Sequence, residues 1–425
     1  MTRRSRCDPR VVLSSPRLAG VFALCVLVCC AAASAGQEAL ALNPCGPGRF
    51  VPARHAPEPV RAWFASRSHA PNTTATLFVR ARATGATLRL YQVVAAHWWT
   101  EVAPASQLAL RGGTERLAVR IEDWPSGLYF ADVSTPDGSG LAPFIVRAKR
   151  AGESRVAVVL PTYTWAAYNL RDSDGNGYGD TWYADPRVRT VDLERPFLNG
   201  GLPQHLGNFV DWFADQHLSA DFYSDEDLNA IRSGDRLASL YDFVVFSSHE
   251  EYVTQHMFSM VERYRDLGGN LAFLSANNFY ARVHIGAGRM TCVGHFRDFG
   301  LPESRLVGVQ YIDWYHGIYR SRPYVLRSVS TAPWLFRGTG LRAGDTFGFS
   351  YGVEIDGVAS SSPLGTKVIA DIPAVFGPGK TAQMTFYRTR SGAKVFAAGA
   401  MGFEAPQSGE TARMLRNLWD HLAQR

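Results

Sequence analysis

The stretch YDFVVFSSHEEY, from Tyr241 to Tyr252, decides the fold: a continuous apolar run stops and polar side chains follow at once. Such runs are typical of strands buried on both faces of a parallel sheet. Two similar runs, RVAVVLP (Arg155–Pro161) and NLAFLS (Asn270–Ser275), lie before and after it. Segments with apolar residues at helical spacing separate the three runs. This alternation predicts a doubly wound parallel sheet within residues 149–425.

The chain ahead of residue 149 follows a different pattern. Residues 61–148 contain short alternating segments such as TATLFVRARA and GLYFADVS, separated by Gly, Pro and Asp, which predicts an antiparallel β-sandwich. Residues 36–60 are rich in Pro and Gly and are expected to form a linker. Residues 283–380 break the strand–helix alternation and contain strand-like pieces, so we expect an irregular insertion there. A closing hairpin and a terminal helix capped by Ser408 should follow.

The first 35 residues have the features of a secretory signal. Five arginines precede an apolar stretch from Leu18 to Ala33, and Ala33-Ser34-Ala35 offers a cleavage site. This pattern predicts a secreted or periplasmic protein without a membrane attachment after cleavage. The alternative is an uncleaved membrane anchor, because the stretch approaches spanning length.

Composition and missing motifs exclude several classes of function. The formal net charge is +6, but the arginines are scattered rather than gathered in a stripe, which argues against nucleic-acid binding. The chain has no G-x-S-x-G elbow, no H-E-x-x-H helix and no P-loop. Cleavage would leave two cysteines, Cys45 and Cys292, which could form one disulfide or remain separate buried thiols.

Polar and aromatic residues follow each apolar run at the point where the strand should end. These segments are Thr162–Asn169, His249–Tyr252 and Ala276–Tyr280. Open α/β sheets bind ligands beyond the carboxyl ends of their strands, so the three segments predict one site.

His249 and Glu251 are the strongest pair in these segments. Being two residues apart, they point the same way in an extended chain. An imidazole beside a carboxylate suits a general base with its orienting group, or a metal ligand with a neighbouring base. The alternative is a histidine that caps backbone groups and a surface glutamate. Taken singly, Tyr168 and Tyr129 could equally be packing residues, and Asn277 a turn residue.

The loop DSDGNGYGD resembles a calcium-binding loop. Asp172, Asp174, Asn176 and Asp180 match ligand positions 1, 3, 5 and 9, but Tyr183 stands where the bidentate glutamate is expected. Calcium binding is one expectation, and a Gly-rich polar turn is the alternative.

Several stretches together resemble the C-terminal region of the N,N-dimethylformamidase large-subunit family. They are WPSGLYFADV, VVLPTYTWAAYN, YDFVVFSSHEEYVT, YRDLGGNLAFLSANNFYARV, YGVEID and VFAAGAMGFE, within about residues 60–404. The resemblance implies a β-sandwich followed by a glutamine-amidotransferase-like, flavodoxin-like α/β domain. It also implies hydrolysis of a small formamide-like substrate, and either a small partner subunit or a homo-oligomer.

The resemblance also implies a mononuclear ferric iron site. Tyr129, Tyr168 and Glu251 would be the metal ligands. His249 and Asn277 would lie next to these ligands without binding the metal. Glu354 or Glu404 would be a further acidic group, with Glu354 preferred. Phenolates and carboxylates are hard oxygen donors that suit a trivalent ion. Two other interpretations stay open. One is a non-catalytic secreted relative with the same fold, and the other is a carbohydrate-binding sandwich using Trp98 and Trp99.

Overall fold

The computed structural model describes residues 43–46, 48–53, 58–95, 98–198, 208–316 and 322–424. The expected signal segment and part of the expected linker lie outside these residues. Residues 43–425 form one compact unit. Within the described residues, helices fall short of the length and apolar character that crossing a membrane requires.

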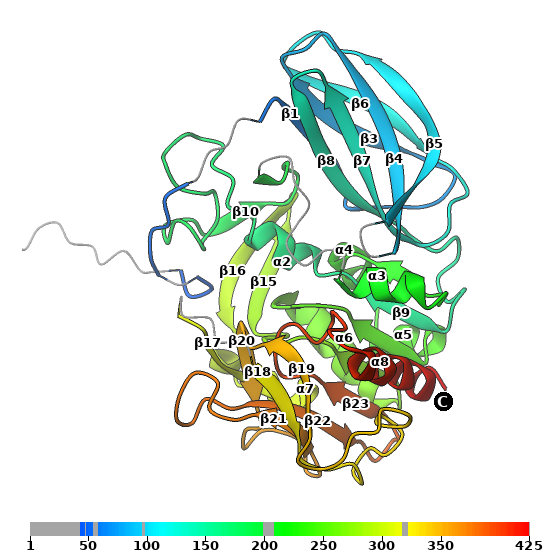
Figure 1. Ribbon diagram of the computed structural model, residues 1–425. Coiled ribbons are helices and arrows are strands. Elements are labelled where there is room, and N and C mark those ends of the chain that lie inside the picture. The colour runs from blue at the N-terminus through cyan, green and yellow to red at the C-terminus, as the bar shows by residue number, and fades with distance from the viewer. Residues whose placement is uncertain are drawn as a thin grey trace, which may run out of the picture. The chain divides into compact units, whose positions relative to one another are not determined.

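Eight strands at the N-terminal side form two antiparallel-rich sheets that face each other across a shared core (Figure 1). Along β3, the alternate residues Ala75, Leu77 and Val79 are buried in this core, as the period of two in the sequence requires. The first sheet has the order β1-β3-β6 and the second β2-β8-β7-β4-β5. The strands are β1 (Val60–Phe64), β2 (Ser68–His69), β3 (Thr73–Ala81), β4 (Gly85–Ala95), β5 (Trp98–Ala109), β6 (Thr114–Ile121), β7 (Gly127–Thr135) and β8 (Gly138–Val146).

The largest sheet after β8 has nine strands, with the order β11-β9-β12-β14-β23-β22-β21-β18-β19. Its first five strands are parallel and the others antiparallel. The apolar runs form β9, β12 and β14, in which every residue is buried. The strands are β9 (Val156–Val159), β11 (Asp221–Tyr223), β12 (Phe243–Phe246), β14 (Asn270–Phe273), β18 (Arg322–Leu326), β19 (Thr346–Tyr351), β21 (Lys367–Ile372), β22 (Ala382–Arg388) and β23 (Lys394–Ala397).

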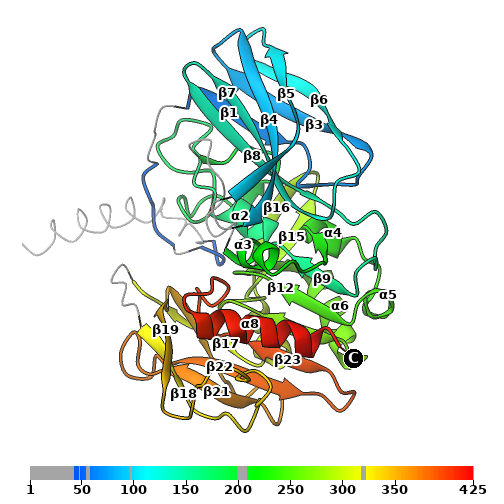
Figure 2. The ribbon, with the colours of Figure 1, turned by 45° about the vertical axis from the view of Figure 1, so that its right-hand side comes forward.

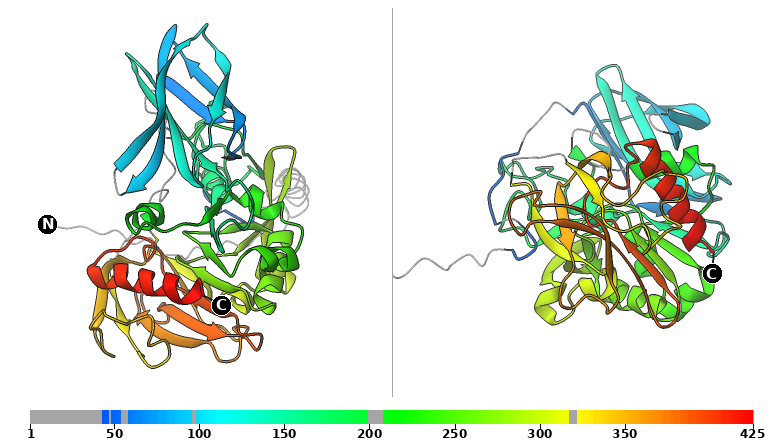
Figure 3. Two further views of the ribbon diagram at one scale, coloured as in Figure 1. Left: turned by 90° about the vertical axis from the view of Figure 1, so that its right-hand side faces the viewer. Right: turned by 60° about the horizontal axis from the view of Figure 1, so that its bottom comes forward.

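Two separate cores explain why the parallel strands are apolar throughout. Val156 and Val158 join one core together with helices α3 and α8, while Ala157 and Val159 join the other together with α6. Helix α8, red in Figures 2 and 3, begins after Ser408, whose side chain accepts a hydrogen bond from Thr411 N. The helices are α2 (Thr162–Ala167), α3 (Asn208–Asp215), α4 (Asp225–Asn229), α5 (Gly234–Leu240), α6 (Gln255–Asp266), α7 (Ser304–Val307), α8 (Gly409–Leu422) and the 3₁₀ helix η2 (Phe296–Phe299).

Residues 283–380, expected to form an irregular insertion with strand-like pieces, contain short strands separated by loops. Part of this stretch extends the antiparallel edge of the large sheet through β18, β19 and β21. These strands are short and separated by Gly-rich turns, which hides their alternation in the sequence. The remaining strands form sheets of order β10-β16-β15-β13 and β17-β20. They are β10 (Thr190–Asp192), β13 (Tyr252–Thr254), β15 (Ala281–Gly286), β16 (Arg289–His295), β17 (Gln310–Trp314) and β20 (Glu354–Gly357).

The sandwich is joined to the large sheet by buried contacts. Leu128, Phe130 and Ile145 belong to the same core as β9 and β12. The buried guanidinium of Arg67 donates to the carbonyl of Leu193 at 2.9 Å, and Ser126 Oγ accepts from Phe222 N at 2.8 Å. The two parts therefore pack as one body.

A disulfide between Cys45 and Cys292 ties the N-terminal segment to β16. This segment runs close to the loop that carries Trp182: a Cβ added at Gly46 would lie 2.3 Å from the Trp182 carbonyl oxygen. Only glycine permits that approach. Of the two possibilities left open by the sequence, the structure has the bridge.

Candidate functional site

Five of the residues singled out in the sequence lie together beyond the carboxyl ends of β9, β12 and β14. Tyr168 is the residue that ends α2, directly after β9. His249 and Glu251 follow β12, and Asn277 follows β14. Glu354 comes from much later in the chain, where it begins β20. The parallel order of neighbouring strands puts these loops at one edge of the sheet.

Three side-chain oxygens form the centre of the site. The Tyr168 hydroxyl lies 3.1 Å from Glu251 Oε2, and the Tyr183 hydroxyl lies 2.8 Å from the same carboxylate oxygen. The two hydroxyls are 2.9 Å apart. We call these three atoms the oxygen triangle.

His249 lies beside the oxygen triangle with a defined orientation. Its Nδ1 is 2.9 Å from the Ala276 carbonyl oxygen, which can only accept, so Nδ1 carries a proton. Its Nε2 is 3.1 Å from Glu251 Oε2 and 3.2 Å from the Tyr168 hydroxyl. The imidazole therefore presents Nε2 to the centre of the site.

Glu354 and Asn277 close the other side. Asn277 Nδ2 donates to Glu354 Oε2 at 2.7 Å, and Glu354 Oε1 lies 3.4 Å from the Tyr168 hydroxyl. Asn277 has a φ of 53°, a left-handed conformation that asparagine tolerates better than most residues. Its backbone N–H donates to Asp356, which holds this turn in place.

Tyr183 belongs to the site, although reasoning from the sequence did not select it. It lies in a loop between α2 and β10, far from any strand end. The hydroxyl of Tyr252 lies 2.7 Å from that of Tyr183, and it is also 3.0 Å from the Cys45 carbonyl oxygen. Trp182 Nε1 donates to Tyr252 at 3.1 Å. The one available signal was that Trp182-Tyr183 is an aromatic pair directly after the acidic loop.

Tyr129 does not join the site, and its expected role as a metal ligand is corrected here. Its side chain is fully buried in the sandwich core, where its ring stacks on Trp124 and Phe144. Its hydroxyl donates to the Pro125 carbonyl at 2.8 Å, four residues upstream. This is the corner-tyrosine arrangement of sandwich folds. Tyr183 supplies the second phenol instead.

Glu404, the second candidate for the further acidic residue, lies near enough to His249 for the imidazole charge to act on its pKa, but its carboxylate bonds to another group. It is fully buried, and its Oε2 accepts from Gly402 N at 2.9 Å. Among the described residues, the carboxylate that contacts Tyr168 and Asn277 is Glu354. The geometry therefore favours Glu354.

The electrostatics of the cluster are dominated by burial and negative charge. Burial, followed by the charge of Glu251, raises the pKa of both Tyr168 and Tyr183 well above the ordinary value. Burial lowers the pKa of His249, but Glu354 and Glu251 outweigh it and raise that pKa to about 10. A cation at the oxygen triangle would act against these shifts, because it favours phenolates and a neutral imidazole.

The donor set fits a metal ion. Two oxygens bound at right angles to one cation, each at about 2.1 Å, are about 3.0 Å apart. The oxygen triangle has edges of 2.8, 2.9 and 3.1 Å. In the described part of the chain, neither lysine nor arginine pairs with Glu251 or Glu354, and the cationic partner of both carboxylates is the His249 imidazole. Buried carboxylates of this kind are normally paired or bound to a metal.

The acidic loop after Tyr168 gathers its carboxylates as the sequence suggested. Ligand atoms of Asp172, Asp174 and Asp180 all lie within 4.8 Å of one another. The Asp172 carboxylate accepts from Gly175 N at 2.7 Å and Gly177 N at 2.9 Å, so the loop is held in a tight turn. This turn is separate from the oxygen triangle.

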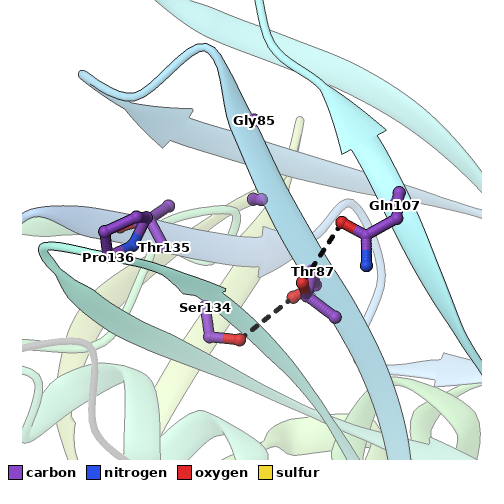
Figure 4. A pocket seen from close by; sticks show the side chains of 7 residues that line it. Gly85, Thr87, Gln107, Ser134, Thr135 and Pro136 are labelled. Atoms are coloured by element: carbon purple, nitrogen blue, oxygen red, sulfur yellow. Dashed lines mark hydrogen bonds between the residues drawn. The ribbon is translucent and has the colours of Figure 1, made fainter.

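The sandwich carries a shallow groove of a different character. It is lined by small neutral residues, and Thr87 bonds to Gln107 and Ser134 there (Figure 4). The lining lacks titratable side chains, so acid–base chemistry has no group to use. Trp99 is 48% exposed and packs edge-on against Phe130 at 4.6 Å. The side chain of Trp98 lies outside the described residues.

Comparisons with known proteins give one informative match. A family model described as N,N-dimethylformamidase beta subunit-like, C-terminal, matches residues 114–406. No curated protein matches the chain.

Solved structures give only weak likenesses. A superoxide reductase (neelaredoxin) from Ignicoccus hospitalis is 12% identical over 21% of this chain and 82% of its own, with a TM-score of 0.16. A carbohydrate acetylesterase from Xanthomonas citri is 8% identical over 49% of this chain and 58% of its own, with a TM-score of 0.16. At these TM-scores the likenesses say nothing about the fold.

Proposed function

The chain belongs to the N,N-dimethylformamidase beta subunit-like, C-terminal family, and we propose that it is an exported metal-dependent hydrolase of the C–N bond in an amide. The observation that carries the proposal is the oxygen triangle, in which two phenols and a carboxylate lie within 3.1 Å of one another. Family membership supports the reaction class, and the triangle supports the metal dependence.

Tyr168, Tyr183 and Glu251 are the residues that would hold the metal. As phenolates and a carboxylate they carry three negative charges, which suits a single ferric ion. When bound, such an ion supplies Lewis acidity, which polarises an amide carbonyl and lowers the pKa of water. In this proposal Tyr183 is the second phenolate ligand, the role that the resemblance implied for Tyr129.

His249 is placed to move the proton. Nδ1 is committed to the Ala276 carbonyl, so Nε2 is the atom that accepts a proton from the attacking water. The water oxygen bonds to the carbonyl carbon, and the proton is then delivered to the amide nitrogen as the C–N bond breaks. The products are a carboxylic acid and an amine, which account for all atoms of amide and water.

Glu354 and Asn277 are placed to support this transfer. Glu354 Oε2 lies 3.8 Å from His249 Nε2, close enough for its charge to stabilise the imidazolium that forms. Asn277 holds the carboxylate in place through its amide. Removing either group should slow turnover more than it weakens metal binding.

Several further features are part of the proposal. The parallel half of the large sheet, with its site at the strand ends, supports a glutamine-amidotransferase-like domain. Export follows from the signal features of residues 1–35, and the disulfide accords with an oxidising compartment. The family description as a subunit supports a partner subunit or a homo-oligomer. The clustered carboxylates of the acidic loop support calcium binding.

The first experiment is a metal analysis combined with an amide hydrolysis assay on the purified mature chain. Iron at about one ion per chain, a visible phenolate-to-iron absorption band and release of amine from N,N-dimethylformamide would support the hydrolase. Protein that takes up no iron and cleaves no amide would favour the second candidate, a secreted binding protein with the same fold. For that candidate, half-exposed Trp99 supports a carbohydrate ligand.

A further inference from the structure

Three large aromatic side chains that are only partly buried belong to the segments that carry Asn277 or pair with Glu354: Tyr280, Tyr311 and Trp314. We call them the aromatic face. Neither the proposed metal centre nor the proton transfer uses them.

The pairing of β17 with β20 fixes the direction of two of these rings. Trp314 lies opposite Glu354, and Tyr311 lies opposite Asp356, with a bulge between Tyr311 and Asp313 that brings both onto one face. Side chains directly opposite each other in an antiparallel pair project from the same face. Glu354 projects toward Tyr168 and Asn277, so Trp314 and Tyr311 project toward the same site.

Tyr280 completes the face from another element. It follows β14, three residues after Asn277, and its ring lies 5.0 Å from that of Tyr311. The charge of Glu251 contributes to the raised pKa of Tyr280, and that of Glu354 to the raised pKa of Tyr311, each after burial. Both directions accord with phenols on the same side as the site carboxylates.

Neighbouring side chains hold these rings in place. His295 stacks on Tyr280 at 4.2 Å, and the Arg297 guanidinium lies 5.0 Å from the same ring. Arg49 lies 5.3 Å from the ring of Trp314. These rings are held by their neighbours and are still partly open to solvent. A ligand that stacks on their flat apolar surface therefore causes little further loss of side-chain entropy.

We propose that the aromatic face binds an aromatic ring carried by the amide substrate, so that the enzyme prefers aryl amides to amides with only methyl substituents. The preference rests on the proposed hydrolase function. An amide bond at the oxygen triangle leaves one of its two substituents to meet the aromatic face, where a ring can stack on Trp314 or Tyr311. A methyl group offers far less area for this contact.

The test compares three substrates with the iron-loaded wild-type enzyme. Formanilide carries a ring on nitrogen, benzamide carries one on the carbonyl carbon, and N,N-dimethylformamide has none. We expect kcat/KM to be at least about 10-fold higher for one of the ring-bearing amides, since stacking and ring burial both favour the aryl substituent. Which of the two is favoured identifies the side of the amide that meets the aromatic face.

Variants connect the preference to the face itself. Trp314→Leu should reduce the ratio of aryl to dimethyl kcat/KM about 10-fold. Trp63→Leu is the matched control, because Trp63 is a partly buried tryptophan on β1, stacked on Phe78 at 5.3 Å, and should leave the ratio unchanged. Equal kcat/KM for all three substrates, or an unchanged ratio in Trp314→Leu, would overturn the inference.

A binding measurement separates this inference from the hydrolase proposal. If the iron-loaded protein cleaves no amide, the hydrolase proposal fails, and the affinities for benzamide and acetamide then test the aromatic face alone. Tighter binding of benzamide that is lost in Trp314→Leu would support the inference. Equal affinities for the two amides would overturn it.

Discussion

The hydroxyl of Tyr183 lies 2.8 Å from Oε2 of Glu251, although the two residues are 68 positions apart and neither belongs to a regular element. A second phenol, Tyr168, lies 3.1 Å from the same oxygen. This relationship defines the proposed ligand set, and it replaces Tyr129, whose hydroxyl is occupied by the Pro125 carbonyl.

The carboxyl of Glu354 should matter for turnover and little for metal binding. Glu354→Gln keeps the shape and the contact with Asn277 but removes the charge beside His249. We expect kcat to fall about 10–100-fold while iron content stays within about twofold of wild type. Parallel assays of amine release and bound iron would check this. If the iron content instead falls in proportion to activity, Glu354 is itself a metal ligand.

Glu404→Gln is the matched control for that variant and makes its own pH prediction. Burial raises the pKa of Glu404 to about 7, from an ordinary value of 4.5. Between these two values the folded state holds a proton that the unfolded chain releases. The contribution of this proton to the free energy of unfolding is therefore fully present below pH 4.5 and is lost as the pH rises through 7. The glutamine variant should gain stability relative to wild type over this window, by up to about 3 kcal/mol.

Urea unfolding at several pH values would measure this difference. The wild type and Glu404→Gln must be compared because Asp356 is also buried, and burial raises its pKa to about 8. Asp356 therefore changes the unfolding free energy with pH equally in both proteins. A difference in unfolding free energy that does not change between pH 4 and pH 8 would show that Glu404 titrates normally. Turnover by Glu404→Gln should stay close to wild type.

The disulfide should stabilise the fold and the site together. It closes a loop of 247 residues between Cys45 and Cys292, and the Cys45 carbonyl contacts Tyr252 beside Tyr183. The double variant Cys45→Ala, Cys292→Ala should lose about 2–5 kcal/mol of unfolding free energy. Wild type treated with a reductant should shift to the same urea midpoint. Identical midpoints for the oxidised wild type and the variant would contradict this.

The acidic loop predicts a response to calcium. Calcium should raise the melting temperature of wild type by a few degrees at concentrations well above Kd. Asp172→Asn combined with Asp174→Asn should abolish the shift. Asp137→Asn, which changes an exposed turn aspartate on the sandwich, should keep it. A shift of equal size in all three proteins would mean that calcium binds elsewhere.

Much of the fold could be predicted because strands that are buried on both faces have a continuous apolar sequence. The runs that form β9, β12 and β14 are apolar throughout, since cores lie on both of their faces. The same reasoning located His249, Glu251 and Asn277, because their loops begin where those strands end. The terminal helix followed from Ser408 as a cap.

The remaining parts of the site depend on long-range packing that has no periodic signal. Tyr183 reaches Glu251 from an irregular loop, held there by Tyr252 and Trp182. Tyr129 was selected by resemblance, but its hydroxyl satisfies a local carbonyl, as a corner tyrosine does. The strand-like pieces of residues 283–380 could not be assigned to particular sheets, because Gly-rich turns interrupt them before an alternation can develop.

The iron content of Tyr183→Phe and Tyr129→Phe, measured side by side after identical loading, tests the central claim most directly. Both changes remove one hydroxyl from a tyrosine and keep the ring. The oxygen triangle predicts that Tyr183→Phe loses most of its iron and its visible absorption band. Tyr129→Phe should keep both and lose only about 1 kcal/mol of stability with its hydrogen bond to Pro125. Full iron and an unchanged spectrum in Tyr183→Phe, with loss of both in Tyr129→Phe, would contradict the account.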